Sequence, residues 1–370
     1  MVQVFNSQLT DLMIVLDEPL AGLSGEEKNS VFRNILELAE KHTVLIVDHS
    51  DIFVDSSSIV TALGPAGGAR GGYIIDYRKY LSDEAAEHSF DIHAPDGELK
   101  INVYNQVYHY RGVSVSILRN AMNYITGASG VGKSTLLREY FPQVFENYLY
   151  ISQKPLTGNK NSSVVTAIDI FGRIQEIYAK STGKDKKLFS NLTGNEGACP
   201  CCGGSGYIEY GYDSRTKVRL DCKDCLGTGF NRVIKKYKVR GKSMFDIWNM
   251  TIDEAAEFFY SLDPKITKLL AEASSIMLGH LRLGQPTSSL SGGENIRIKI
   301  MKAAKSSSEI LGIDEPFRGL NSSEIYKVSL FLNELVSKGK TVAVVDHSEI
   351  AKKYFCRNIN LVNRDGILCG

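Results

Sequence analysis

Residues 127–134 read Gly-Ala-Ser-Gly-Val-Gly-Lys-Ser, the G-x-x-x-x-G-K-S pattern of a loop that surrounds phosphate oxygens. An apolar run precedes this P-loop and a helical pattern follows it, which is the order of elements that phosphate binding needs. We therefore predict an ATP site with Mg²⁺, in which Lys133 reaches the β- and γ-phosphates and Ser134 holds the cation. A flexible loop beside a chance lysine is the alternative. The predicted cofactor-binding residues of the loop are Gly127, Ser129, Gly130, Gly132, Lys133, Ser134 and Thr135.

A second group of polar residues follows apolar strands. The run at 310–316 ends in Asp314, Glu315 and a proline. In P-loop ATPases such a strand delivers its aspartate to the magnesium shell, and the following glutamate polarises the attacking water. We predict Asp314 as a second Mg²⁺ ligand and Glu315 as the catalytic base. Gln153 and His347, each after a strand, complete the predicted catalytic set as a contact to Mg²⁺ and water and as a γ-phosphate sensor; a surface glutamine is the alternative for Gln153.

The strand with its acidic pair occurs twice. Residues 16–24 read LDEPLAGLS and residues 313–321 read IDEPFRGLN, and the strands TVLIVDHSDI and TVAVVDHSEI follow at nearly the same offset. A repeat period near 297 residues indicates two copies of one ATPase half, with His49 as the counterpart of His347. The predicted helices of the two copies are residues 26–41 and 323–338.

Upstream of the second copy lies LSGGE at 290–294, the signature of ABC-type ATPases. Its serine hydroxyl and glycine N–H groups present a second phosphate-binding surface, which acts on nucleotide held by another nucleotide-binding domain. By the repeat period, the first copy's signature would fall just before Met1, so we expect a truncated or split two-domain ATPase, or a start codon placed too late. The other face of the ATP site is then expected from a homodimer or a separately encoded N-terminal half. The predicted signature residues are Ser291, Gly292, Gly293 and Glu294.

Five of the seven cysteines fall in two C-x-x-C-x-G-x-G segments, with nineteen residues between the pairs. This spacing is typical of a four-cysteine zinc site, and clustering in an apparently cytosolic chain argues against a disulfide framework. Four thiolates fill a tetrahedral Zn²⁺ and leave no open position, so the predicted role is structural; redox-active pairs are the alternative. The glycines are expected to turn backbone N–H groups toward the sulfurs. The predicted ligands are Cys199, Cys202, Cys222 and Cys225, and Cys201 is the odd thiol.

Composition excludes several classes of protein. A net charge of +1 excludes a chain that is basic throughout, so nucleic acid would have to meet a local patch such as the basic stretch at 235–242. A solvated strand edge is the alternative for that stretch. No apolar run approaches the roughly eighteen residues of a membrane helix, and the start lacks the basic region of an export signal. We expect a cytoplasmic protein without membrane contact.

Four segments together resemble one family, the UvrA subunit of the bacterial excinuclease. They are the P-loop GASGVGKSTLL, the zinc knuckles, RGKSMFDIWNMTIDEAAEFF and LGQPTSSLSGGE. The resemblance covers nearly the whole chain, aligned to the family's C-terminal half. It implies a dimeric ATPase that binds lesion-containing double-stranded DNA in nucleotide excision repair and loads its partner UvrB. The first P-loop, the first signature and the UvrB-binding region are missing, and Asp48 and Asp346 stand where the family usually has glutamate.

The expected fold class is therefore α/β, an ABC-type P-loop ATPase with a helical signature-domain insertion that carries a zinc-binding module. Shortened UvrA-like proteins that protect DNA from an antibiotic are an alternative function, as is an ATP-switched DNA-binding protein with little turnover. An inert remnant is disfavoured because one P-loop, one signature, both acidic strand ends and all four knuckle cysteines are intact. The expected parts are 1–76 (remnant of the first nucleotide-binding domain, with Walker B strand, D-loop and switch histidine), 77–98 (linker), 99–155 with 282–370 (second nucleotide-binding domain) and 156–281 (insertion, with knuckles at 199–229).

Overall fold

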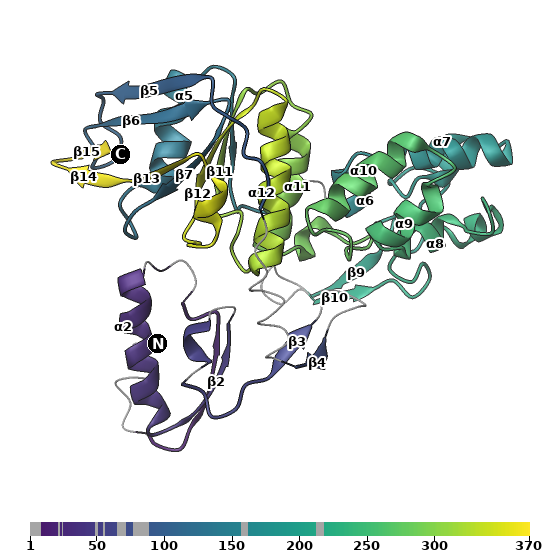
Figure 1. Ribbon diagram of the computed structural model, residues 1–370. Helices are drawn as coiled ribbons and strands as arrows, with labels where there is room; N and C mark the ends of the chain where they lie inside the picture. The colour runs from purple at the N-terminus through teal and green to yellow at the C-terminus, as the bar shows by residue number, and fades with distance from the viewer. Residues whose placement is uncertain are drawn as a thin grey trace. The chain divides into compact units, whose positions relative to one another are not determined.

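A computed structural model describes residues 9–20, 23, 25–48, 51–54, 56–64, 72–76, 89–156, 162–211 and 218–370. The chain divides into two compact units (Figure 1). The first combines Met1–Ser152 with Ser306–Gly370, and the second is the continuous segment Gln153–Lys305. The second unit is therefore an insertion between two strands of the first.

A five-stranded parallel sheet forms the centre of the first unit, in the order β13-β7-β12-β11-β8. Its inner strands are apolar runs that are buried on both faces, as the strands of parallel sheets are. In the register of the sheet, Asp314 at the end of β11 pairs with Val345 at the end of β12. The strands are β7 (Met122–Thr126), β8 (Tyr148–Ile151), β11 (Ile310–Asp314), β12 (Thr341–Val345) and β13 (Arg357–Asn360).

The helical segment after the P-loop shares one core with this sheet and with a second sheet of order β14-β15-β6-β5. It comprises α4 (Lys133–Thr135), the π-helical turn η3 (Leu136–Tyr140) and α5 (Phe141–Val144). Pro142 has no N–H and its ring crowds the preceding turn, which accounts for the widened turn. β5 and β6 are antiparallel. The second sheet contains β5 (Gly97–Val103), β6 (Gly112–Arg119), β14 (Val362–Arg364) and β15 (Ile367–Cys369).

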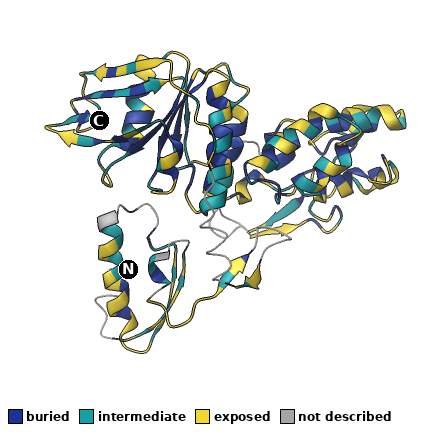
Figure 2. Cartoon of the chain, in the orientation of Figure 1, coloured by how far each residue is buried: buried dark blue, intermediate teal, exposed yellow. Residues whose placement is uncertain are grey.

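The repeated segment forms a β–α–β unit with parallel strands in both copies, as the sequence predicts. The first copy is β1 (Met13–Asp17), α2 (Gly25–Ala39) and β2 (Thr43–Val47), and the second has α12 (Ser322–Ser337) between β11 and β12. Exposed residues alternate along β1 and β2, whereas β11 and β12 are almost wholly buried (Figure 2). The 3-10 turn η1 (Asp51–Phe53) and the hairpin of β3 (Ala62–Gly64) and β4 (Tyr73–Ile75) follow the first copy. His49 lies outside the described residues.

The second unit is mostly helical, with capped helix starts. Thr251 and Glu254 form a capping box at the start of α9. The antiparallel hairpin of β9 (Tyr207–Tyr210) and β10 (Val218–Asp221) lies between the two cysteine pairs. The helices and helical turns are α6 (Val164–Ala167), α7 (Phe171–Thr182), η4 (Lys186–Phe189), η5 (Arg232–Lys236), α8 (Met244–Asn249), α9 (Ile252–Phe259), α10 (Pro264–Ser275), η6 (Thr287–Ser289) and α11 (Gly292–Ala303).

The second unit extends beyond the predicted insertion of 156–281. The N–H groups of Leu283 and Gly284 donate to the carbonyls of Met250 and Trp248 over 2.9 Å and 2.8 Å, which ties the segment before the signature to the inserted helices. In the basic stretch at 235–242, the first two lysines end the turn η5, and Val239 and Lys242 form an isolated antiparallel bridge. Among the helices of the described ranges, none has both the length and the apolar character required to cross a bilayer.

Candidate functional site

The backbone of the P-loop is left-handed at three glycines. Gly127, Gly130 and Gly132 have φ angles of 147°, 75° and 110°, which only glycine adopts without strain. A side chain at Gly132 would overlap the ring of Tyr110, and the Tyr110 hydroxyl donates to the carbonyl of Gly130 over 3.1 Å. The buried tyrosine therefore braces the loop. Ser129 and Ser134 are exposed on it, and Thr135 is half-buried.

Lys133 lies over the loop that precedes it. Its Nζ atom donates to the carbonyls of Gly127 and Ala128 over 2.8 Å and 2.9 Å, and the residue is only 7% exposed. Burial lowers the pKa of the ammonium, while the nearby carboxylates of Glu315 and Asp314 act in the opposite direction. The positive charge thus lies between two carbonyls of the loop and close to the acids at the end of β11.

The two predicted Mg²⁺ ligands lie side by side although they are 180 residues apart in sequence. The Ser134 hydroxyl donates to Oδ1 of Asp314 over 3.3 Å, and the Tyr150 hydroxyl donates to Oδ2 over 2.9 Å. Burial raises the pKa of Asp314, and these hydrogen bonds oppose the rise. A hydroxyl and a carboxylate supply the oxygen ligands that Mg²⁺ prefers, so this pair fits the cation.

Glu315 and His347 follow two neighbouring strands. Glu315 has a left-handed φ of 50°, and its N–H donates to the Val345 carbonyl over 2.7 Å. Its carboxylate lies 3.7 Å from the guanidinium of Arg318. Burial, followed by the charge of Lys133, lowers the pKa of His347, which keeps its imidazole neutral at neutral pH. Lys133, Glu315 and His347 therefore gather at the carboxyl ends of parallel strands, where α/β sheets bind their ligands.

The signature residues belong to the second unit and form the N-terminus of α11. Ser291 Oγ accepts from the Glu294 N–H over 3.2 Å, and the Glu294 carboxylate accepts from the Ser291 N–H over 2.7 Å. Gly292 and Gly293 open the first turn. His280 Nε2 lies 3.0 Å from the other carboxylate oxygen, and this contact holds the pKa of Glu294 at about 2. Because Ser291 Oγ serves the cap as an acceptor, its own proton remains available to a phosphate.

Gln153 is half-buried and is the first residue of the second unit. It and the signature are described only within that unit, so their predicted contacts with nucleotide stay predictions.

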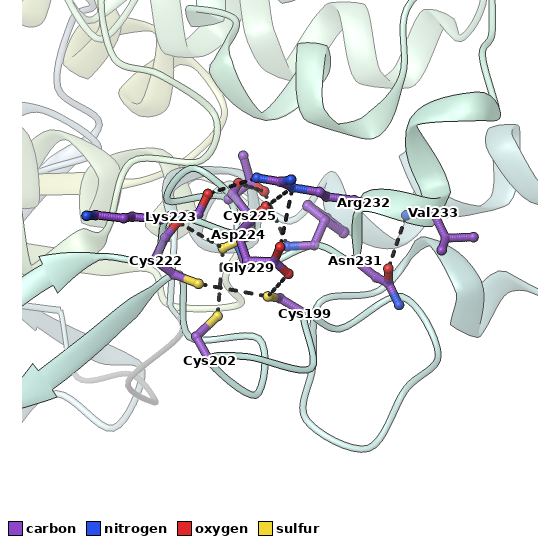
Figure 3. A network of polar contacts seen from close by, with 12 residues as sticks. Cys199, Cys202, Cys222, Lys223, Asp224, Cys225, Gly229, Asn231, Arg232 and Val233 are labelled. Atoms are coloured by element: carbon purple, nitrogen blue, oxygen red, sulfur yellow. Dashed lines mark hydrogen bonds and ion pairs between the residues drawn. The ribbon is translucent and has the colours of Figure 1, made fainter.

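Four cysteine side chains converge between β9, β10 and the loops beside them (Figure 3). Their sulfur atoms all lie within 4.8 Å of one another, with Cys199 and Cys222 at 4.0 Å and Cys202 and Cys225 at 3.7 Å. Zn–S bonds of about 2.3 Å in a tetrahedron separate the sulfurs by about 3.8 Å, so the arrangement fits Zn²⁺. Burial raises the pKa of Cys199 to about 11, and a bound cation would offset that cost of forming thiolates.

Backbone N–H groups point at two of the sulfurs, as predicted. Gly206 donates to Cys202 Sγ and Gly229 donates to Cys225 Sγ, each over 3.3 Å. Both glycines have left-handed φ angles, of 83° and 74°, and a Cβ on either would overlap a carbonyl oxygen of the opposite knuckle. These glycines let the two knuckles pack against each other. Cys201 is exposed and is not part of the cluster.

Sequence reasoning assigned no role to Tyr110, Tyr150 or His280. The Tyr148-Leu-Tyr150 run did hold a signal, because alternate residues of a strand share a face. The Tyr148 hydroxyl donates to the Leu137 carbonyl over 2.7 Å, so this face of β8 meets the helical segment after the P-loop. No local pattern pointed to His280, whose partner Glu294 lies 14 residues away.

Comparisons with known proteins agree with this geometry. A family model described as ABC transporter matches residues 110–318. UvrABC system protein A of Aquifex aeolicus is 29% identical over 92% of this chain and 42% of that protein, and the Staphylococcus aureus (strain COL) protein is 28% identical over 92% and 41%. The crystal structure of UvrA2 from Deinococcus radiodurans matches with a TM-score of 0.83 at 25% identity, over 94% of this chain and 47% of that one. The chain spans less than half the length of these relatives.

Proposed function

Because the chain belongs to the ABC ATPase family, we propose that it is a UvrA-like ATPase, which binds and hydrolyses ATP with Mg²⁺ and couples this to binding of damaged double-stranded DNA. One observation carries the ATPase part: Ser134 and Asp314, the two expected Mg²⁺ ligands, lie in hydrogen-bond contact beside Lys133. Similarity to UvrA along 92% of the chain supports the DNA part.

Each residue of the proposed site has one task. The P-loop N–H groups and Lys133 bind the phosphates, and Ser134 and Asp314 hold Mg²⁺, which neutralises phosphate charge in the transition state. Glu315 accepts a proton from the attacking water, and neutral His347 donates a hydrogen bond to the γ-phosphate. Gln153 completes the contacts to Mg²⁺ and water. Ser291 serves the nucleotide of a facing domain rather than its own.

DNA and zinc belong to the second unit in this proposal. Zn²⁺ on the four cysteines is structural, since its four thiolates leave no open position. It fixes the hairpin of β9 and β10, whose Arg219 guanidinium lies 4.7 Å from the centre of the Tyr207 ring. Cationic and aromatic side chains suit a contact with the DNA backbone and bases. UvrB is the further proposed partner, since the relatives are subunits of a UvrABC system.

The first repeat supports a partner that supplies a P-loop half. Within the described ranges, β1 and β2 pair only with each other, whereas β11 and β12 are flanked by β8 and β7. Val345 of β12 packs in one core with the helical segment after the P-loop, and its counterpart Val47 is exposed. We infer that a P-loop half from outside this sequence, with its own signature, covers β1 and β2 and completes the ATP site.

The test is ATP turnover by the purified chain as a function of its own concentration. It is repeated with the part of Aquifex aeolicus UvrA that this chain does not match. Activation by that part is expected. Turnover that instead rises faster than linearly with the chain alone would replace the P-loop partner by a homodimer. Lys133→Ala should abolish ATP binding, with exposed Lys327→Ala as the matched control; absence of ATP binding in the wild-type chain would refute the ATPase.

The DNA part is tested separately. A duplex with one bulky lesion should raise ATP turnover more than the same duplex without it, and binding should weaken steeply with salt. Equal turnover with both duplexes would remove damage recognition from the proposal. UvrB is then added to the lesion complex, and a slower-migrating species is expected if it binds.

A further inference from the structure

The most deeply buried carboxylate near the ATP site is that of Asp346, which is 4% exposed. It accepts three backbone hydrogen bonds. Oδ2 accepts from the N–H of Phe317 over 2.9 Å, and Oδ1 accepts from the N–H groups of His347 and Ser348 over 2.7 Å and 2.9 Å. One side chain therefore joins the loop after β11 to the loop after β12.

Both loops carry residues of the proposed chemistry. Phe317 lies two residues after Glu315, and His347 is next to Asp346 in sequence. The second loop is fixed from its other side as well, since the buried Tyr124 hydroxyl donates to the Ser348 carbonyl over 2.8 Å. The main chain at Glu315 is held in turn by its hydrogen bond to Val345. The Asp346 carboxylate thus holds together the loop after β11, which carries Glu315, and the loop after β12, which carries His347.

We propose that Asp346 is a positioning residue for ATP hydrolysis, which holds the Glu315 loop and the His347 loop in register. The inference rests on the proposed function, because it assigns chemistry to those two residues. An ionised carboxylate is suited to this role because it has only acceptors, and three N–H donors point at it. An amide would turn a donor toward an N–H group and leave a buried backbone N–H unpaired.

The repeat provides an internal control. Asp48 stands before His49 in the first copy as Asp346 stands before His347 in the second. Asp48→Asn makes the same chemical change in the copy that contains no described P-loop. A loss of kcat in Asp346→Asn that is absent from Asp48→Asn is then specific to the loops around the ATP site.

The experiment compares kcat and KM for ATP and the NMR signals of ¹³C-labelled histidine rings in the two variants. The His347 signal is assigned with His347→Gln. Asp346→Asn should lower kcat at least about tenfold, change KM less than about threefold and move the His347 signal, since small misplacements of catalytic groups are costly. Measured on the chain without an added P-loop half, Asp48→Asn should stay within about twofold of wild type. A folded Asp346→Asn protein with wild-type kcat and an unmoved His347 signal would overturn the proposal.

A second variant and a readout independent of turnover complete the experiment. If Asp346→Asn does not fold, Asp346→Thr, which is shorter and carries one hydroxyl in place of the carboxylate, is measured in its place with the same expectations. If the wild-type chain shows no turnover under any condition, the proposed ATPase fails, and the His347 signal alone decides the loop register. A His347 signal that moves in Asp346→Asn but not in Asp48→Asn supports the positioning role of Asp346. A His347 signal that moves in neither variant refutes it.

Discussion

The two copies of the β–α–β repeat share a sequence pattern and differ in what surrounds them. Met13 is 70% exposed and its counterpart Ile310 is 7% exposed; Val47 is 55% exposed and Val345 is 1% exposed. The pattern is sufficient to form two parallel strands and a helix in both places. It is not sufficient to bury the second face of the strands.

The cause of the difference is the set of neighbouring elements. In the first copy a small core of Leu20, Ile35 and Phe53 lies on the α2 side of the strands. In the second copy Val345 also packs with Leu136 and Tyr140 of the segment after the P-loop. That segment both fills the core and carries Lys133 and Ser134. The elements that bury the strand therefore also supply the residues with which the acidic pair can bind Mg²⁺ and phosphate.

The largest expected effect separates the two acidic pairs. Glu315→Gln should lower ATP turnover about 10²- to 10⁴-fold while ATP stays bound, because the base is lost and the phosphate contacts remain. Glu18→Gln, the same change in the first copy, should leave turnover of the chain within about twofold when no P-loop half is added. Phosphate release at saturating ATP measures both, and equal losses would mean that the copies are not distinct.

The next effect concerns stability. Val345→Lys places an unpaired charge in the core and should destabilise the chain by more than about 4 kcal/mol. Val47→Lys, on an exposed position, should change the free energy of unfolding by less than about 0.5 kcal/mol. Urea unfolding followed by far-UV circular dichroism compares them. A large loss in Val47→Lys would show that this face is already covered in solution.

A pH effect of several-fold is expected in the second copy. Burial raises the pKa of Asp346 to about 6, so its carboxylate gains a proton and loses acceptor capacity as pH falls through that value. The charge of Glu315 also raises the pKa of Asp346, and the three backbone N–H groups bound to the carboxylate lower it. ATP turnover should fall as the pH is lowered from 7 to 5. Asp346→Asn should flatten this acidic limb of the pH profile, and Asp48→Asn should keep it.

The sign of the stability change separates this limb from acid unfolding. A folded-state pKa above the unfolded one means that protonation of Asp346 favours the fold as pH falls from about 6 toward about 4. His347 acts in the opposite sense, because burial lowers the pKa of its imidazole. Circular dichroism at each pH should report folded protein across the limb. Unfolding in step with lost turnover would remove Asp346 as its cause.

Removal of the metal is expected to change the difference between the two copies least. Cys222→Ser should release Zn²⁺ and loosen residues 190–235, since three thiolates leave the site incomplete. The difference in hydrogen exchange between β1–β2 and β11–β12 should not change, because the cysteines belong to the other unit. Zinc content and exchange rates of the variant test both statements. A retained zinc would contradict the four-thiolate site, and altered exchange in the repeats would couple the units.

The sequence alone determined the features that are encoded in short continuous segments. The P-loop, the acidic pair, the signature cap and the two knuckles each depend on residue types at fixed spacing, and backbone geometry follows from that spacing. Glycine conformations, the Ser291–Glu294 cap and the Gly–cysteine hydrogen bonds are of this kind. The repeat likewise predicted two similar β–α–β units, within two residues of their helix ends.

Only the tertiary structure decided which distant residues meet. Tyr110 lies under Gly132, Tyr150 binds Asp314, and Asp346 joins the loops of β11 and β12, through contacts that no local pattern encodes. The same is true of burial, since nothing in the strands TVLIV and TVAVV distinguishes the exposed copy from the buried one. Hydrogen bonds within a turn are set by its own residues, whereas burial and long-range contacts are set by whatever elements pack against it.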